Sequence, residues 1–461
     1  MKTLSLFGMN NELDRNYMEN GASIAGGQRA ADPMGTREAW IHRDMSHVWH
    51  GFTQMSTFTD WEPIIVESGD GRYLIDVDGK RYFDAISSLW VTTLGHCIPE
   101  LNKAIIDQLG RIAHSTLLGN GNVAVVELAE QLAQVVPVNS PHFLFASDGA
   151  SAVEQGIKIA FQYWHNQGAK GKNTYLSFTD AYHGDTIGAM SIGDKGFGTD
   201  LFDPLRFEII RTPGYQNKDW LELAARSITD NAHRIAAVVV EPIVQAASGM
   251  HITDPAKLAQ LAEICTRHGV LLVFDEVATG FGRTGALFAS ELCGVQPDIL
   301  CIGKGLTGGY LPMSATVVSE AVYAEFLGQN ERALYHGHSY GGNALAAAVA
   351  KRHLELINSW NVLDNVTTRA KELSYLLEER IRPCKGVRDI RHAGLMCGIE
   401  VDPYADVPGK RGKEICAFAT RNGILLRPLG DVVVLMPPLT TTAEELEMVV
   451  ATVQEALVAN G

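Results

Sequence analysis

The sequence contains no apolar run that approaches the ~20 residues that a membrane-spanning helix requires. Its first residues, MKTLSLFGMNNELDRN, hold only a brief apolar stretch, which is too short for the core of a signal peptide. Cysteine is scarce and scattered: there are seven, an odd number, and no CxxC pair. These absences argue against a disulfide framework and a structural zinc site, and they favour a reducing compartment. We therefore expect a cytoplasmic protein.

Basic residues are also few. The chain has 38 Lys and Arg against 53 Asp and Glu, which gives a formal net charge of −15. An acidic balance of this size argues against nucleic acids and anionic membranes as partners. Apolar residues make up 46% of the 461 residues and charged residues 20%, which is ordinary for a folded protein with a large core.

The residue pattern changes along the chain. Residues 1–45 are polar, rich in Gly and Ala and without a clear period, so we expect a loosely ordered N-terminal extension. Residues 72–86 form two alternating runs joined at Asp78-Gly79, which predicts a hairpin. After about residue 360 the pattern predicts two helices, a hairpin over 423–440, and a last helix with a Thr cap and a Glu-rich first turn.

Between about residues 90 and 350, short apolar runs alternate with helical patterns. The runs predict strands over 141–146, 174–179, 236–241, 270–275, 298–303 and 314–318. Residues 255–269 start with Pro, carry apolar residues at helical spacing and end with Gly, which predicts a helix. This alternation predicts an α/β fold with a mostly parallel central sheet flanked by helices.

Two polar residues come at the ends of predicted strands. Asp275 closes the run VLLVFD, and Lys304 follows the run DILCIG. Ligands of open α/β sheets bind beyond the carboxyl ends of the strands. A pyridoxal 5'-phosphate (PLP) site needs a Lys that forms a Schiff base and an acid that pairs with the pyridinium nitrogen, so this pair predicts such a site. The simpler interpretation is that each residue only begins a loop.

The segment SDGAS predicts a phosphate site. It lies between the run HFLFA and a helical pattern, so Gly149 and Ala150 would present their backbone N–H groups at the positive end of a helix. An ordinary capped helix without a ligand is the alternative.

Two further segments contain side chains that could contact a ligand or a metal. In DAYHGDT, Tyr182 could stack on a flat aromatic ring, and His183 beside it is a weaker candidate for acid–base work. In HGHS, residues 336–339, two His residues could suggest a metal, but a third ligand is not apparent and we expect no metal.

The motifs SDGAS, YHGDT, EPIVQAASGM, DEVATGFGRTG, CIGKGLTGGYLP, HGHSYGGNALAAAVA and RPLGD occur in the order typical of one family. In these motifs the chain resembles the class III, fold type I, PLP-dependent aminotransferases from about Val48 to the C-terminus. The resemblance implies a large PLP-binding domain over 89–354. It also implies a smaller α+β domain, built from both chain ends as residues 46–88 plus 355–461.

The resemblance also implies roles. Lys304 would carry PLP and move the proton, Asp275 would hold the pyridinium, and Tyr182 would pack on the ring. Gly149 and Ala150 would bind the phosphate, together with His338 and Ser339 of the partner subunit in a homodimer with shared active sites. The residues implied for substrate binding are Phe52, Leu89, Trp90, Tyr182, Gly337 and Arg427, with the Arg427 guanidinium on a distal carboxylate.

Within the family, WHGFTQM and SSLW most resemble the 7,8-diaminopelargonic acid synthases of biotin biosynthesis, which aminate 8-amino-7-oxononanoate. Synthases that use S-adenosylmethionine carry a Tyr where this chain has Phe52, two Trp where it has Leu89-Trp90, and a Tyr where it has Leu439. The strings FTQM, HGHSY and RPLGD resemble the lysine-using branch, so we expect L-lysine as amino donor and S-adenosylmethionine otherwise.

Two alternatives share the cofactor motifs. A broad ω-amino acid or amine:pyruvate transaminase would differ in Phe52, Leu89, Trp90 and Arg427, because these residues concern the substrate. A noncatalytic regulator with a PLP fold could dispense with Lys304. Retention of Lys304, Asp275 and the phosphate loop favours an enzyme with a ping-pong cycle, in which one cavity accepts two substrates in turn.

Overall fold

The computed structural model describes residues 35–196 and 198–460. The chain divides into two compact units, Met1–Ile65 and Val66–Gly461. Each unit is described by itself below. Within the described ranges, every helix is too short or too polar to span a lipid bilayer.

The described part of the first unit contains the helix α2 (Arg37–His47) and the 3-10 helix η1 (Met55–Trp61). Helix α2 corrects our expectation for residues 37–45, which we took as loosely ordered. The Thr36 hydroxyl accepts a hydrogen bond from the amide of Ala39, and this cap offsets the weak apolar period of the helix. The rest of the predicted extension, residues 1–34, lies outside the described residues.

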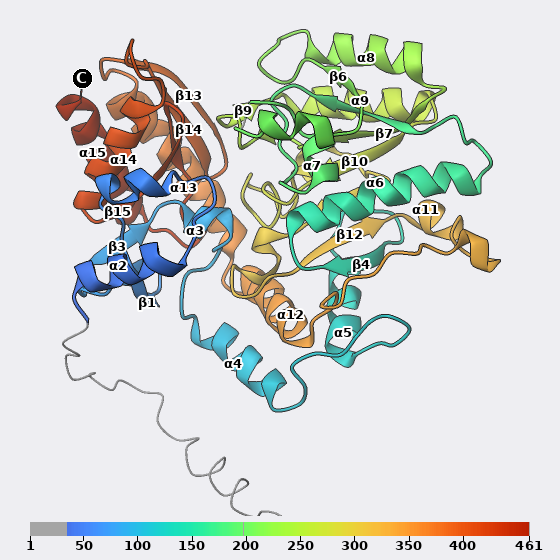
Figure 1. The fold of residues 1–461 in the computed structure, drawn as a ribbon, viewed down its shortest axis with the longest axis horizontal. Coiled ribbons are helices and arrows are strands. Elements are labelled where there is room, and N and C mark those ends of the chain that lie inside the picture. The colour runs from blue at the N-terminus through green and yellow to red at the C-terminus, as the bar shows by residue number, and fades with distance from the viewer. Residues whose placement is uncertain (1–34, 197, 461) are drawn as a thin grey trace, which may run out of the picture. The chain divides into compact units, whose positions relative to one another are not determined.

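The largest sheet of the second unit has seven strands. Its strand order is β4 (His142–Ala146), β12 (Ser314–Val318), β11 (Ile299–Ile302), β10 (Leu271–Asp275), β7 (Ile235–Val240), β5 (Thr174–Phe178) and β6 (Ile210–Thr212). Figure 1 shows β4, β12, β10, β7 and β6 of this sheet on the right. The pairs from β11 to β6 are parallel, whereas β12 runs antiparallel to both of its neighbours. The predicted α/β fold with a mostly parallel sheet is confirmed.

The sheet is buried on both faces, and its strands therefore read as continuous apolar runs. On β10, Val273 packs in the core on the side of helix α6 (Gly149–Asn166), whereas Phe274 packs in the larger core on the opposite side. Figure 1 shows α6 lying across the sheet. Each of the six predicted runs forms a strand, and the observed ends lie within one or two residues of the predicted ones.

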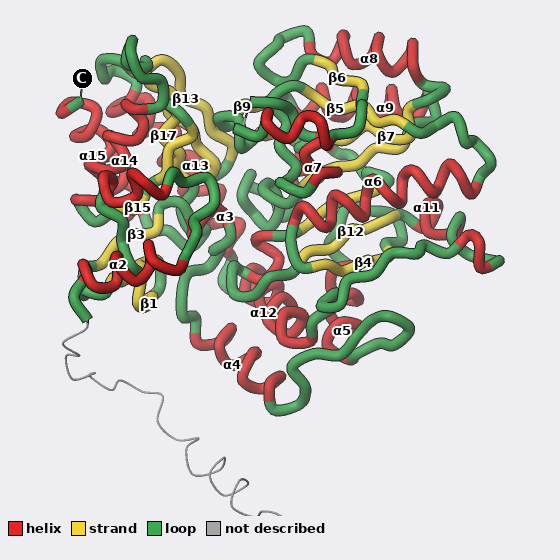
Figure 2. Tube along the Cα trace, in the orientation of Figure 1, coloured by secondary structure: helices red, strands yellow, loops and turns green. Residues whose placement is uncertain are grey.

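Two smaller sheets complete the scaffold. One has the order β1 (Val66–Asp70), β2 (Tyr73–Asp76), β3 (Arg81–Asp84) and β15 (Ile424–Leu425), so it joins residues from both ends of this unit. The other is β13 (Val387–Ala393), β14 (Met396–Val401), β17 (Val432–Leu435) and β16 (Arg427–Leu429). Figure 2 shows β13 and β17 together with helices α13, α14 and α15. A two-stranded sheet, β8 (Val244–Gln245) and β9 (His251–Ile252), was not predicted.

The predicted hairpins and the capped last helix are present. β2 and β3 pair antiparallel around Asp78-Gly79, and β16 pairs with β17. In α15 (Ala443–Ala459) the Thr442 hydroxyl accepts from the amide of Glu445, whose carboxylate accepts from the amide of Thr442. Residues 424–425 leave the predicted hairpin, because they pair with β3 as β15.

The other helices connect these sheets. Their bounds are α3 (Ser87–Trp90), α4 (Pro99–Leu109), α5 (Val123–Ala133), α7 (Ile187–Ile192), η2 (Asp200–Leu205), α8 (Trp220–Asn231), α9 (Pro255–Arg267), α10 (Ala289–Cys293), η3 (Lys304–Thr307), α11 (Glu320–Ala324), η4 (Asn330–Arg332), α12 (Ala344–Ser359), α13 (Val362–Leu376), η5 (Leu377–Ile381) and α14 (Lys410–Arg421). Helix α9 confirms the helix predicted over 255–269, and its Pro lies at the first position, where it sacrifices no hydrogen bond.

Candidate active site

Neighbouring strands of the central sheet end at the same edge, and this edge carries the polar residues. In the register of β10 and β11, Asp275 lies opposite Cys301, and the amide of Glu276 donates to the Cys301 carbonyl at 2.9 Å. Strand β11 ends at Ile302, and Lys304 comes two residues later, so the two neighbouring strand ends bring Lys304 beside Asp275. The next strand, β7, ends at Val240, and Glu241 follows it at the same edge.

A cavity of about 880 Å³ lies at this edge of the sheet. Asp275 and Lys304 both line it, as the predicted shared cofactor site requires. The other lining residues are Trp90, Val91, Ser147, Asp148, Gly149, Ala150, Tyr182, His183, Gly184, Asp185, Thr186, Glu241, Val277, Ala278, Thr307, Gly309, Tyr310, Leu311, Pro312 and Met313. Four other predicted site residues line the same cavity, namely Trp90, Gly149, Ala150 and Tyr182, together with the weaker candidate His183.

Lys304 is held in a constrained position. Its φ is +40°, in the left-handed region that non-glycine residues rarely occupy, and such conformations gather at functional sites. Its amine nitrogen lies 4.7 Å from the centre of the Trp90 ring. Desolvation by burial lowers the pKa of Lys304, while the negative charge of Asp275 acts in the opposite direction. A lowered pKa leaves more of the amine unprotonated and able to act as nucleophile or base.

Asp275 is buried, with 5% of its surface exposed. One carboxylate oxygen accepts a hydrogen bond from Nδ1 of His183 at 2.7 Å, and the other accepts from the amide of Val277 at 3.1 Å. Nε2 of His183 is buried and has no partner among the described residues. The sequence indicated His183 only as a weak candidate for acid–base work, whereas the structure shows that it bonds the carboxylate of Asp275.

Glu241 is a residue of the cavity that we did not predict. Its side chain is buried and accepts from the amides of Tyr182 (3.1 Å) and Ala246 (3.2 Å). Desolvation by burial raises the pKa of Glu241 to about 7. Its place at the end of the predicted strand 236–241 could have indicated it, since Asp275 was found by the same signal.

The amino end of helix α6 faces the cavity through Asp148, Gly149 and Ala150. The Asp148 carboxylate caps the helix by accepting from the amide and the hydroxyl of Ser151, at 2.9 and 2.8 Å. N–H groups of a first helical turn have no partner inside their helix, so those of Gly149 and Ala150 are available to an anion. A Cβ on Gly149 would lie 2.6 Å from a methyl carbon of Val277, so only glycine allows this close approach.

The loop after β5 packs against this helix end. Gly184 has a φ of +121°, and a Cβ there would lie 2.4 Å from that of Ala150. The loop carries Tyr182 into the cavity, where its hydroxyl donates to Asp185 at 2.8 Å. Burial, followed by the hydrogen bond to Asp185, raises the pKa of Tyr182, so this phenol stays protonated at neutral pH.

Several predicted residues do not line this cavity. Leu89 is exposed although Trp90 beside it is buried, and Arg427 is exposed at the start of β16. Gly337 and Ser339 are also exposed, and Nδ1 of His338 accepts from the amide of Tyr340. Phe52 belongs to the first unit and exposes 66% of its surface. The roles that we assigned to these residues stay predictions.

The site residues fit PLP. The cavity combines a Lys of lowered pKa, a buried carboxylate held by His183, and a helix amino end at which Val277 leaves no space for a Cβ. Lys304 would hold the cofactor covalently, Asp275 its pyridine nitrogen, and Gly149 with Ala150 its phosphate. Among the described residues, no cluster of His, Cys, Asp and Glu has the composition of a metal site, and His336 instead accepts from Lys158 at 3.0 Å.

The fold and the cavity define the class of protein, a PLP-dependent transferase of fold type I. Comparison with known proteins then gives the family: the chain belongs to the class III aminotransferases, because the model of that family, aminotransferase class-III, matches residues 56–457. The protein is therefore a PLP-dependent transaminase that uses a small-molecule amino donor and a keto acceptor.

Curated relatives and solved structures cover nearly the same part of the chain. The adenosylmethionine-8-amino-7-oxononanoate aminotransferase of Nitratidesulfovibrio vulgaris is 42% identical, over 90% of this chain and 81% of its own. The enzyme of the same name from Aquifex aeolicus is 39% identical, over 92% and 97%. The crystal structure of the enzyme of that name from Methanocaldococcus jannaschii has a TM-score of 0.88 and 36% identity, over 92% and 99%.

A second kind of transaminase is also similar in structure. The PLP-bound amine transaminase from an uncultivated Pseudomonas species has a TM-score of 0.84 and 30% identity, over 90% of this chain and 99% of its own. This similarity agrees with the cofactor site described above.

Proposed function

We propose that the protein transfers an amino group to 8-amino-7-oxononanoate and so makes 7,8-diaminononanoate in biotin biosynthesis. The observation that carries the proposal is the similarity to relatives named for this acceptor, at 42% and 39% identity over 90% and 92% of this chain, combined with a cavity that both Lys304 and Asp275 line. The cycle is ping-pong, since both substrates must use the one cavity in turn.

Each cavity residue has a task in this proposal. PLP, when bound, supplies an electron sink for the electron pair released when the carbon that bears the amine loses its proton. Lys304 removes that proton and returns it at a second position, which requires an unprotonated amine and is favoured by its lowered pKa. Asp275, held by His183, would keep the pyridine nitrogen protonated, and Tyr182 would pack on the ring.

The residues that we propose for substrate binding come from the resemblance of the sequence to the family. Trp90 lines the cavity and would border the substrate channel. Leu89, Phe52 and Gly337 would complete that channel, and Arg427 would bind the distal carboxylate of the acceptor. An exposed guanidinium such as that of Arg427 is free to take a carboxylate in a bidentate manner.

We propose L-lysine as the amino donor, because Phe52, Leu89 and Leu439 replace side chains that the adenosylmethionine-using synthases carry. The names of the relatives support S-adenosylmethionine instead. A half-reaction separates the two donors. With L-lysine alone, the absorbance of bound PLP should convert to that of the aminated cofactor, and conversion by S-adenosylmethionine alone would overturn the donor assignment.

The acceptor is tested separately. The aminated enzyme is mixed with 8-amino-7-oxononanoate or with pyruvate, and return of the PLP absorbance is followed. The proposal expects fast return with 8-amino-7-oxononanoate only. Equal return with pyruvate would contradict it and would favour the broad ω-transaminase.

We further propose that the enzyme is a cytoplasmic homodimer, in which His338 and Ser339 of the partner subunit reach the phosphate of PLP. Ser339 is exposed, His338 is half-buried, and neither residue lines the cavity of its own chain, which supports this arrangement. All seven cysteines are free thiols, which supports a reducing compartment.

A further inference from the structure

The turn that carries Trp90 has an unusual backbone. Ser87, Ser88, Leu89 and Trp90 have φ values of 51°, 47°, 69° and 72°, so four consecutive residues that are not glycine are left-handed. L-residues are disfavoured in this region, because the Cβ approaches the following carbonyl oxygen, and runs of them are rare. Hydrogen bonds from Trp90 N to Ile86 O and from Val91 N to Ser87 O, both 2.9 Å, close the turn.

A buried carboxylate holds the turn in place. Asp84, with 0% exposure, accepts from the amide of Ser88 at 2.9 Å and from its hydroxyl at 2.8 Å. Nε2 of His96 lies 2.9 Å from the carboxylate oxygen that also accepts from the Ser88 hydroxyl, so the two form a hydrogen bond. Since Asp84 ends strand β3, these bonds anchor the strained turn to a sheet.

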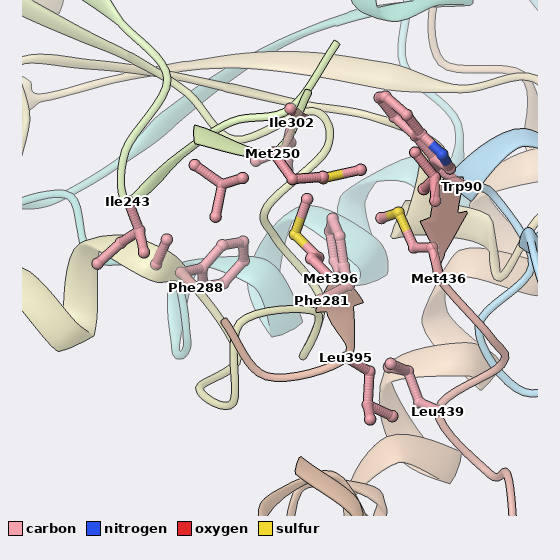
Figure 3. Close-up of a cluster of buried hydrophobic side chains, with 14 of the residues drawn as sticks. Trp90, Ile243, Met250, Phe281, Phe288, Ile302, Leu395, Met396, Met436 and Leu439 are labelled. Carbon is pink, nitrogen blue, oxygen red and sulfur yellow. The ribbon is translucent and has the colours of Figure 1, made fainter. Parts of the chain in front are cut away.

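A second set of bonds holds the far side of the turn. The Ser87 hydroxyl donates to the carbonyl of Met436 at 2.6 Å. The buried Arg283 guanidinium donates to the carbonyls of Thr92 and Pro437 at 2.7 and 2.5 Å. Trp90 and Met436 belong to one buried apolar cluster, drawn in Figure 3.

The turn has a consequence for the active site. Trp90 is 6% exposed and lines the cavity, and its ring lies 4.7 Å from the Lys304 nitrogen, whereas Leu89 one residue earlier is 46% exposed. A right-handed or extended backbone over the same residues would send the indole in another direction, because the direction of Cβ follows φ and ψ.

We propose that Asp84 is a positioning residue: its carboxylate holds the left-handed turn Ser87–Trp90 and thereby sets the indole of Trp90 against Lys304. The catalytic consequence rests on the proposed role of Lys304, but not on the identity of donor or acceptor. Asp84 touches neither substrate nor cofactor in this account and acts only through Trp90.

The first test measures the place of Trp90 directly. Acrylamide quenching of tryptophan fluorescence is compared in four forms of the full-length, PLP-loaded protein: wild type, Asp84→Ala, Trp90→Phe and the double variant. We expect Asp84→Ala to increase quenching, because Trp90 becomes accessible, and we expect no increase when Trp90 is already Phe. Unchanged quenching in Asp84→Ala, or the same increase in both backgrounds, would overturn the proposal.

The second test is a double-mutant cycle on the donor half-reaction, with Asp84→Ala and Trp90→Ala. Residues that act as one unit are non-additive. We expect Asp84→Ala to slow the half-reaction by about tenfold in the wild type and by less than about threefold when Trp90 is Ala. Full multiplication of the two losses would overturn the proposal.

Milder variants keep the test possible if the Asp84→Ala variant does not fold. Asn at position 84 can still accept from the amide of Ser88, so Asp84→Asn should recover most of the wild-type quenching, and Ser88→Ala should fall between the two. Asp70→Ala is the matched control, because Asp70 lies in the same sheet but forms only an exposed ion pair with Arg81. If Lys304→Ala kept full activity, the proposed function would fail, while the quenching result would stand.

Discussion

The chemistry of the site depends on Lys304 and Asp275. Two influences on the pKa of Lys304 act in opposite directions. Burial lowers the pKa of Lys304, and the neighbouring Asp275 partly offsets that shift. The carboxylate of Asp275 in turn is held by a hydrogen bond from His183. Both residues were predictable, because each follows a short apolar run. The bond between Asp275 and His183 was not predictable, since it joins the end of β10 to the loop after β5, which lies far away in the sequence.

The lowered pKa of Lys304 predicts how PLP binding depends on pH. The unprotonated amine is the nucleophile, so the rate of PLP uptake by the cofactor-free protein should rise with pH and level off above the pKa of Lys304. The midpoint of this rise equals that pKa. That midpoint should lie below the 10.5 of an ordinary lysine. Stopped-flow absorbance over a pH series measures it, with N-acetyl-lysine amide as the control amine. A midpoint equal to that of the control would contradict the assignment.

Asp275→Asn tests the pairing of carboxylate and pyridine nitrogen. A preorganised charge of this kind contributes on the order of 10² to 10³ in rate. We therefore expect the donor half-reaction to slow by about 10²-fold, while PLP remains covalently bound. Asp254→Asn, which changes only the cap of helix α9, is the control and should react at the normal rate. A normal rate in Asp275→Asn would refute the role of Asp275.

At the scale of elements, the amino end of α6 is the part that local sequence predicts best. A strand, a short polar turn and an amphipathic helix follow one another, and the predicted anion site lies at their junction. The antiparallel course of β12 and the left-handed turn Ser87–Trp90 were not predictable in this way. Both depend on residues far away in the sequence. Strand β12 pairs with β4, and the carbonyl of Met436 accepts from the hydroxyl of Ser87 in the turn.

Gly149→Ala should weaken PLP binding. The added Cβ would meet Val277 at 2.6 Å and push the first turn of α6 away from the phosphate. Loss of one charged hydrogen bond corresponds to about 1.5–3 kcal/mol, or at least about tenfold in the dissociation constant of PLP. Absorbance titration of the cofactor-free protein measures this constant.

A size exchange provides the control. Val277→Ala removes the methyl groups that the new Cβ would meet, so the double variant Gly149→Ala, Val277→Ala should bind PLP nearly as well as Val277→Ala alone. If the double variant binds as poorly as Gly149→Ala, the clash is not the cause and our account of the phosphate site is wrong.

At the scale of the whole molecule, the proposed homodimer predicts that active sites are shared. Lys304→Ala and His338→Ala would each be defective, but in a mixed dimer one site would have both an intact Lys304 and an intact partner's His338. Random exchange of subunits would form mixed dimers as about half of the total, so about a quarter of wild-type activity should return. Unfolding and refolding the two variants together, then measuring activity, tests this.

The outcome can contradict the dimer proposal in two ways. Activity of the mixture that never exceeds the sum of the two separate variants would exclude shared sites. Full activity of His338→Ala alone would remove that residue from the site. His268→Ala is a control, because His268 lies at the end of α9 and does not line the cavity.

The family and the α/β fold followed from motifs along the chain, whereas the division into domains and the partner contacts concern relations between distant segments. Residues 37–45 illustrate the limit. They carry no strong apolar period, yet they belong to helix α2, whose first turn is capped by the hydroxyl of Thr36. Glu241 shows the converse, since a residue placed like Asp275 was missed although the same signal was present.

The most direct test of the central claim is to find which lysine carries PLP. The purified enzyme is reduced with borohydride, digested, and its peptides are mapped by mass spectrometry. The account predicts the pyridoxyl group on Lys304 and its absence from every other lysine in the wild type. A pyridoxyl group on another lysine, with Lys304 unmodified in active enzyme, would contradict it.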